Sequence, residues 1–521
     1  MARSRITVDA IEKIKDRVYG LAVESQRSLL NCYYIDIRVE ASESKYAVAE
    51  RGAPKEGGED YGLSFGVKVI AGDRLKAPGY YGGSLGPSDL KKIEKVIKEG
   101  IEHAHKRALA NSSWKESVKE RLGSLAESIY STELAPTPAY KDTVFTEFKK
   151  DPRKVPLRKI LKEAVGISEL ISKLDEAPGF NFIYIYTTLV RELFASSEGS
   201  LIDQMYPVTQ GIAYIIAGDE SHYDYIGDRK GWEVIEGENI YDVSFRQFAL
   251  ELARETLELS CAEVLPPTEK EVTVVTDPHF NALLVHEIIG HPVEADRALK
   301  METGYAGRSW FFKSLGENQI GKRVASELVT AYSDTSLGGY GGYKYDAEGV
   351  KSKRVVHIDK GIFRGFLNSR ETAAILGEEP NGAMRAIDAV FAPLIRMTNT
   401  VFAPGDRDPD EIIKEVEDGY YICGHRIPSI SESRENFSIS ARRVYEIRNG
   451  ELVKLYRSGG ITADSKDYFM SIDAVGNDFK LFPMPNCGKG MPMQAMRLGN
   501  GGPTMRGRAK LTGRKLNENI R

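Results

Sequence analysis

Residues 286–291 read HEIIGH and bring two imidazoles and a carboxylate close together in the chain. Imidazole nitrogen is a common zinc ligand, and a carboxylate beside a metal can act as a general base in hydrolysis. In the familiar zinc-protease pattern the two histidines are four residues apart, whereas His286 and His291 are five apart. Five residues of a regular helix turn through about 500°, which leaves the two side chains about 140° apart. They can share one metal ion only if the helix is irregular between them.

The residues around His291 predict that irregularity. Pro292 cannot donate to the carbonyl of Ile288, and Gly290 tolerates unusual backbone angles. A π-type turn brings residues five apart onto nearly the same side of a helix. We therefore predict a π turn at residues 288–292, with a kink or an early helix end at Gly290 as the alternative. Two ordinary, unconnected histidines are the competing interpretation.

The element that carries the motif should be a core helix. Asp277 and Pro278 are typical of a helix N-cap followed by its first residue. Apolar residues then recur at the three- and four-residue spacing of a buried face, namely Phe280, Leu283, Leu284, Ile288 and Ile289.

A catalytic zinc ion takes three protein ligands, so a third ligand is needed beyond the two histidines. Spacing leaves five candidates: Glu294, His357, His425, Cys423 and Cys487. Cys423 follows an alternating strand pattern and is better explained as a core residue. Cys487, in NCGKGMPM, stands in what we expect to be a glycine-rich loop, an unusual setting for a structural cysteine. Cys487 is therefore the favoured third ligand.

Glu287 has a different expected role. Adjacent helical residues diverge by about 100°, so Glu287 cannot easily bind the metal that His286 binds. It is instead the candidate general base, taking a proton from a water that the metal activates for attack on a carbonyl. This chemistry is that of an amide or ester hydrolase.

The chain is long enough to form two domains, and its pattern favours an α+β fold with largely antiparallel or mixed sheets. We expect an N-terminal α+β domain at residues 1–240. A β-rich domain at 241–521 should carry the motif on a long metal-binding helix, together with the distant cysteine. The glycine-rich GGYGGYKYDAEG fits neither phosphate-loop pattern, so no nucleotide site is expected.

Composition excludes several classes of protein. A net charge of -4 gives no electrostatic reason to expect nucleic acid. No apolar run approaches membrane-spanning length, and the start of the sequence lacks an apolar leader, so we expect a cytoplasmic protein that does not enter membranes. Four scattered cysteines do not form a disulfide framework.

Four blocks of the C-terminal half carry a resemblance: HEIIGHPVEAD, GGYKYDAEGVKSKRVVHIDKGIFRGFLNSRETA, LIRMTNTVFAPGD and NCGKGMPMQAMRLGNGGPTMR. With YGLSFGVKVIAGDRL near the N-terminus, they resemble the TldD/PmbA family, the TldD-type metalloprotease subunits also described as modulators of DNA gyrase. The resemblance spans nearly the whole chain.

The resemblance implies zinc bound by His286, His291 and Cys487, with Glu287 as the catalytic base. It implies unfolded or short peptides as substrates. It also implies a dimer, formed either with a second copy or with a paralogous subunit that lacks the motif. Iron remains possible in place of zinc. The gyrase description gives no reason to expect direct contact with DNA.

Two other functions stay open at this point. A deformylase-like or amidase reaction on a small substrate would use the same ligands. A non-catalytic peptide-binding subunit is the third interpretation, and the joint presence of His286, Glu287, His291 and Cys487 argues against it.

Overall fold

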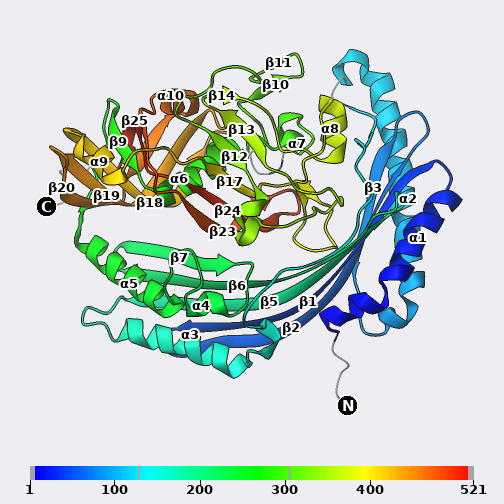
Figure 1. Cartoon of the computed structure of the whole chain (residues 1–521), viewed down its shortest axis with the longest axis horizontal. Helices are drawn as coiled ribbons and strands as arrows, with labels where there is room; N and C mark the ends of the chain where they lie inside the picture. Colours follow the sequence, from blue (N-terminus) through cyan, green and yellow to red (C-terminus); the bar gives the residue numbers. More distant parts are fainter. Residues whose placement is uncertain (1–5, 127–128, 303, 305–306, 514–521) are drawn as a thin grey trace.

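The computed structural model describes residues 6–126, 129–302, 304 and 307–513, and these form two β-rich halves (Figure 1). Within these residues, no helix combines the length and the apolar character needed to span a membrane.

The first half is built on one seven-stranded sheet with unusually long central strands. Its order is β3-β2-β1-β5-β6-β4, and β7 also pairs with β6. The strands are β1 (Cys32–Glu50), β2 (Ala53–Ala71), β3 (Ala77–Ser84), β4 (Lys141–Phe145), β5 (Phe180–Ser196), β6 (Leu201–Ala217) and β7 (Glu220–Asp228). Arg51 and Gly52 connect β1 to β2 with φ of 49° and 79°, as a two-residue hairpin turn requires.

Amphipathic helices cover the sheet. They are α1 (Lys15–Ser28), α2 (Ile93–Leu122), α3 (Leu157–Ser172), the short α4 (Glu233–Glu236) and α5 (Phe245–Cys261). The buried faces of α1 and α2 form one core with β1 and β2. Those of α3 and α5 form a second core with β5 and β6. Helix α5 thus packs on the first sheet, although it follows the predicted domain boundary at residue 240, and that boundary stays a prediction.

The second half contains a small closed barrel. Strands β9 (Val272–Thr276), β25 (Met505–Thr512), β21 (Gly460–Asp464), β19 (Asn436–Arg448) and β18 (Asp418–Ile430) pair in that order, and β18 also pairs with β9 to close the circuit. Strands β8 (Glu263–Val264), β20 (Glu451–Arg457) and β22 (Ala474–Val475) extend it. Helices α9 (Pro409–Lys414) and α10 (Ser465–Met470) lie between its strands in the sequence.

A six-stranded mixed sheet lies beside the barrel. Its order is β14 (Ile362–Phe363), β13 (Val355–Asp359), β12 (Ala331–Ser333), β17 (Asn399–Phe402), β24 (Gln494–Gly502) and β23 (Lys480–Lys489). Two small hairpins are β10 (Phe312–Ser314) with β11 (Glu317–Asn318), and β15 (Met384–Arg385) with β16 (Leu394–Ile395). The remaining helices are α7 (Ala295–Ala298) and α8 (Arg370–Leu376).

Helix α6 (Pro278–Val285) lies between the barrel and the six-stranded sheet and contacts strands of both. It begins as predicted, because the Asp277 carboxylate accepts the backbone N–H of Phe280 at 2.6 Å. Its predicted buried face is confirmed: Phe280, Leu283, Leu284, Ile288 and Ile289 all belong to the main core of the second half. The motif therefore starts from a fixed, buried scaffold.

The second half lies inside the curve of the seven-stranded sheet, with α1, α2 and α3 on the opposite, outer face (Figure 1). Buried ion pairs join the halves: Asp224 of β7 contacts Arg442 of β19 at 2.6 Å, and Lys68 contacts Glu348 at 2.5 Å. The predicted α+β class with antiparallel and mixed sheets is confirmed.

Candidate metal centre

The helix carrying the motif changes to a π turn at His286–Gly290. The N–H of His291 donates to the carbonyl of His286 at 3.1 Å, an i to i+5 bond. This confirms the predicted π turn, which lies at residues 286–290 and so begins two residues before the predicted range of 288–292. Pro292 has no N–H to donate to the carbonyl of Ile288. This carbonyl instead accepts a hydrogen bond from Trp310 Nε1 at 2.9 Å. The irregular backbone is thus stabilised by a side chain that sequence analysis did not single out.

Gly290 is needed for packing. A Cβ atom built at this position would lie 1.9 Å from the sulfur of Met397, a fully buried residue. Only glycine lets the π turn approach Met397 this closely.

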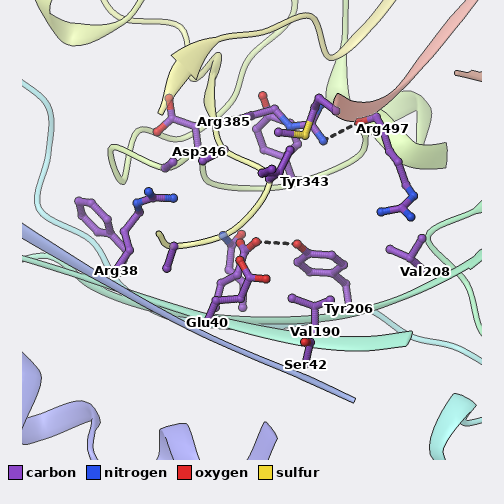
Figure 2. A pocket seen from close by; sticks show the side chains of 18 of the residues that line it. Arg38, Glu40, Ser42, Val190, Tyr206, Val208, Tyr343, Asp346, Arg385 and Arg497 are labelled. Atoms are coloured by element: carbon purple, nitrogen blue, oxygen red, sulfur yellow. Dashed lines mark hydrogen bonds between the residues drawn. The ribbon is translucent and has the colours of Figure 1, made fainter. Parts of the chain in front are cut away.

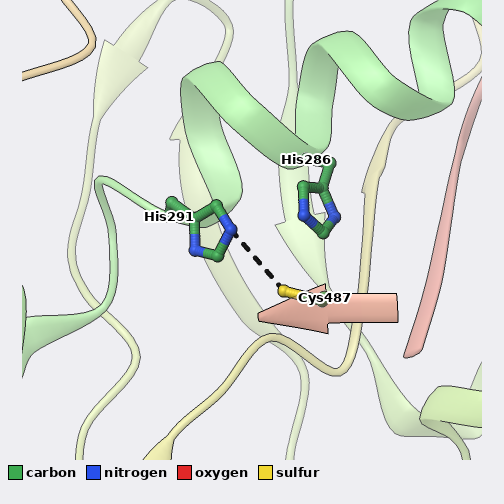
Figure 3. A group of neighbouring side chains, drawn as sticks. All are labelled: His286, His291 and Cys487. Carbon is green, nitrogen blue, oxygen red and sulfur yellow. Dashed lines mark hydrogen bonds between the residues drawn. The ribbon is translucent and has the colours of Figure 1, made fainter. Parts of the chain in front are cut away.

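The structure brings together three of the predicted ligands. The His286 and His291 rings have centroids 4.8 Å apart and planes at 86°, and Cys487 Sγ lies 3.5 Å from His291 Nε2 (Figure 3). One ligand atom from each of the three residues lies within 4.8 Å of the others. All three side chains are buried, with exposures of 4%, 4% and 3%.

Neighbouring side chains set the tautomer of each histidine. Asn500 Nδ2 donates to the carbonyl of Thr400 at 3.0 Å, which turns its Oδ1 toward His286 Nδ1 at 2.8 Å. An amide oxygen can only accept, so Nδ1 of His286 carries a proton and Nε2 is the ring nitrogen that a metal ion would bind. The Glu294 carboxylate does the same for His291 Nδ1 at 3.1 Å. In both rings Nε2 is therefore the nitrogen available to a metal ion, and His291 Nε2 already faces Cys487 Sγ.

Glu294, one of the five third-ligand candidates, supports His291 from behind. It accepts a bond from Arg297 Nε at 2.7 Å and lies 3.2 Å from Lys489 Nζ. Those cations, together with His291, outweigh the effect of burial and hold the Glu294 pKa well below its usual value. Lys489 also contacts Asp296 at 2.7 Å, so a buried charge network fixes the ligand.

Cys487 lies on β23 and not in a loop, so that detail of the sequence prediction is wrong. It pairs with Met496 of β24, after an irregularity in register that follows Met484. Its carbonyl accepts a hydrogen bond from the buried Arg396. The glycine-rich composition around Cys487 favours a loop, but hydrogen bonding to β24 holds this segment as a strand.

The other three candidates lie outside the cluster. His357 is fully buried between Ser333 and the carbonyl of Gly365, and burial lowers its pKa to about 4. His425 stacks on His279 with ring centroids 4.4 Å apart. Cys423 is a buried residue of barrel strand β18, as its pattern predicted.

The electrostatics of the cluster suit a cation. Burial disfavours the Cys487 thiolate, but the charges of His291 and His286 outweigh burial and hold the thiol pKa well below its usual value. Burial likewise opposes protonation of His286, yet the negative charge of Cys487 raises the His286 pKa to about 9. Two imidazole nitrogens and a thiolate are a zinc-type donor set, and the residues present fit such an ion.

Glu287 lies beside this cluster and is more exposed than its neighbours, with 13% of its side chain accessible. Its carboxylate is 3.9 Å from Nε of Arg434, which stands in the turn between β18 and β19 with φ of 64°. Arg434 carries no signal in the sequence, because only the barrel brings this turn to the motif.

The buried cluster of two histidines from the π-distorted helix and one cysteine from β23 has the donor set of a transition-metal site. Residues 269–508 match the family model described as PmbA/TldA metallopeptidase C-terminal domain. The chain belongs to the TldD/PmbA family of metallopeptidases.

Named relatives are similar to this chain in sequence, and a solved structure is similar to it in fold. A metalloprotease of Methanocaldococcus jannaschii is 29% identical over 476 residues, which cover 91% of this chain and 95% of that protein. A zinc metalloprotease TldD homologue of Saccharolobus solfataricus is 30% identical over 46% of this chain and 50% of its own length. The fold is similar to TldE of Thermococcus kodakarensis, with a TM-score of 0.66, 18% identity and coverage of 97% and 100% of the two chains.

Proposed function

We propose that this chain is a zinc-dependent peptidase that hydrolyses unfolded or short peptides. The observation that carries the proposal is the buried cluster of His286, His291 and Cys487, with the carboxylate of Glu287 on the residue next to His286. Membership of a metallopeptidase family and a relative named zinc metalloprotease support it.

His286 Nε2, His291 Nε2 and Cys487 Sγ would hold the zinc ion. When bound, zinc supplies Lewis-acid chemistry toward the carbonyl of the scissile peptide bond. The protein's own part is to fix those three atoms. Asn500 and Glu294 hold the imidazole tautomers, and the β23–β24 pairing holds the thiolate.

Glu287 would act as the general base. Its carboxylate takes a proton from the attacking water and can return it to the leaving amine. Arg434, whose Nε lies 3.9 Å from this carboxylate, places a positive charge beside it. The π turn would place His291 on the same side of the helix as His286. Glu287, as the residue adjacent to His286, would still diverge from it by about 100°.

Burial of the ligands supports the choice of substrate. A folded protein presents rigid surface loops, which cannot reach side chains that are 3–4% exposed. An extended peptide is thin enough to enter such a site. We further propose that the chain works as a dimer, with a second copy or with a motif-lacking paralogue, and similarity to a TldE fold is consistent with the latter.

The test combines metal analysis with peptide cleavage. Wild-type protein should contain about one zinc per chain and cut an unstructured peptide at internal bonds, which a deformylase-like enzyme or a non-catalytic subunit would not do. Cys487→Ala should lose both metal and activity, whereas Cys261→Ala, at an exposed cysteine away from the cluster, should keep both. Equal metal content in the two variants would remove Cys487 from the ligand set, and iron in place of zinc would correct the metal.

A further inference from the structure

A second site lies between the two halves of the chain. It is a cavity of about 200 Å³, lined from the seven-stranded sheet by Arg38, Glu40 and Tyr206, and from the second half by Tyr343, Arg385 and Arg497 (Figure 2). None of the three candidate metal ligands lines it. Its residues have no role in the function proposed above.

Strand β24 contributes residues both to this cavity and to the surroundings of the metal cluster. Side chains alternate between the two faces of a strand. Asn500 contacts His286 on one face of the strand. Arg497 has the other parity and contributes to the cavity. The two sites are therefore distinct, although they share one strand.

Four arginines line the cavity, and none has a carboxylate partner. Arg38 donates to the carbonyl of Phe391, Arg229 to that of Gly342, and Arg385 to those of Met397 and Arg497. Arg497 donates to the amide oxygen of Gln210 at 3.2 Å. Within the described chain, no carboxylate oxygen lies within the 4.0 Å ion-pair distance of any of these four guanidinium groups.

These charges are partly removed from water. Burial lowers the pKa of Arg385 to about 10, and Arg229 and Arg396 disfavour its charge further. Buried arginine is normally paired with an anion. The carbonyl and amide oxygens that accept from these arginines carry no net charge, Arg38 Nε has no hydrogen-bond partner among the described residues, and only Arg38 is influenced by nearby carboxylates, those of Asp36 and Glu192.

The carboxyl groups in the cavity do not balance this charge. Glu40 and Glu192 lie directly opposite each other on β1 and β5, so their negative charges repel, and burial together with Glu192 raises the pKa of Glu40 well above its usual value. Glu192 accepts the hydroxyl of Tyr206 at 2.6 Å. Asp346 accepts three backbone N–H groups, from Glu348, Val350 and Met384. Positive charge therefore exceeds negative charge around the cavity.

We propose that this cavity binds a small organic anion whose carboxylate or phosphate group is held by the neighbouring Arg385 and Arg497, with Arg38 adding positive charge from the opposite side (Figure 2). Planar guanidinium groups are well suited to both anions. Because the cavity is walled by both halves, the bound anion also stabilises their association. The proposal does not depend on the peptidase activity.

Binding to the full, metal-loaded chain is measured by isothermal titration calorimetry with three probes: succinate, inorganic phosphate and the uncharged succinamide. Arg497→Gln is the informative variant, since its guanidinium bonds only a side chain and its loss leaves no carbonyl unpaired. Arg246→Gln is the matched control, an arginine on α5 paired with Glu163 and distant from the cavity lining. Circular dichroism and thermal melting confirm that each variant is folded.

We expect saturable binding of succinate or phosphate, weakened about tenfold or more in Arg497→Gln. Arg246→Gln should bind as wild type does, and Glu40→Gln should bind at least as tightly because it replaces the carboxyl group with an amide that cannot ionise. Binding of succinate alone assigns a carboxylate ligand, and binding of phosphate alone assigns a phosphate. Equal binding of succinamide, equal affinity in Arg497→Gln and wild type, or no saturable binding of either anion would overturn the proposal. Binding at the metal itself would persist in Arg497→Gln and is excluded by the same comparison.

Discussion

Asn500 Oδ1 lies 2.8 Å from His286 Nδ1, and the same amide is anchored through its nitrogen to the carbonyl of Thr400. A side chain that binds no metal thus determines which nitrogen of His286 faces the candidate metal position. This links β24 to the motif helix, 214 residues away in the chain.

Replacement of Asn500 by alanine should weaken zinc affinity by about 10- to 100-fold, because the His286 ring loses the acceptor that fixes its tautomer and orientation. Competition with a chromophoric chelator measures the affinity. Asn500→Asp, which retains an acceptor oxygen, should bind more tightly than Asn500→Ala. Identical zinc affinity in wild type and both variants would show that the contact has no role in metal binding.

Glu287→Gln should keep the metal and lose about 10²- to 10⁴-fold in peptide hydrolysis, because the amide cannot accept the proton of the attacking water. His286→Ala should instead lose the metal. The measurement is turnover of an unstructured peptide by protein whose zinc content has been verified. Undiminished turnover in zinc-loaded Glu287→Gln would rule out Glu287 as the base.

Gly290→Ala should destabilise the protein by about 1–3 kcal/mol, because the new methyl group overlaps Met397. Combining it with Met397→Ala should cost less than the sum of the two single changes, since the space is then vacated. Urea unfolding gives each free energy. Gly20→Ala is the control, because a Cβ there meets nothing within 4 Å on helix α1. Strict additivity of Gly290→Ala and Met397→Ala would contradict the packing argument.

Glu220→Gln should reduce stability by about 3 kcal/mol at neutral pH, because Glu220 of β7 is buried against Arg426 and Arg457 of the second half. Burial opposes its ionisation, but bonds from His222, Ser458 and Arg457 prevail and lower its pKa from 4.5 to about 2. A carboxyl group with a lowered folded-state pKa stabilises above its unfolded value, and that contribution is lost as the pH falls from 4.5 toward about 2.

The stability difference between wild type and Glu220→Gln should therefore shrink over that acidic range. Urea unfolding midpoints at several pH values test this. Glu238→Gln removes an exposed pair with Lys149 and should have little effect at any pH. A difference that is constant down to about pH 2 would contradict the assigned pKa.

Denatured proteins should be cut while the same proteins resist cleavage when folded, because the candidate ligands are buried. The comparison uses one substrate domain and a destabilised variant of it, followed by mass spectrometry of the fragments. A short peptide from the same domain controls for sequence preference. Efficient cleavage of the stable folded domain would show that the site is open to rigid loops.

Local sequence predicted the parts of the site that depend on local physics. Asp277 and Pro278 begin the helix, and Gly290 and Pro292 indicated the π turn, because capping and proline effects act over a few residues. The choice of Cys487 among the candidates rested on its setting and on family resemblance. Asn500, Lys489 and Trp310 were not found at all, because their contacts depend on strand pairing and packing between distant segments.

The fold class followed from strand and turn patterns, but the closed barrel and the cavity of arginines did not. Strand order depends on which segments meet in three dimensions, and β9 lies between β18 and β25, which are far from it in sequence. Arg38 and Arg497 look like ordinary surface residues in the sequence. Only the packing of the two halves places them around one cavity.

The wide sequence separation within the metal cluster has a consequence for synthesis of the protein on the ribosome. Cys487 follows His291 by 196 residues, and β25, which pairs with β9 just before the motif helix, follows Cys487. A nascent chain that already displays both histidines therefore lacks the thiolate and one strand of the barrel. The three side chains of the candidate metal centre cannot come together until β23 has emerged, so the cluster is incomplete during most of translation.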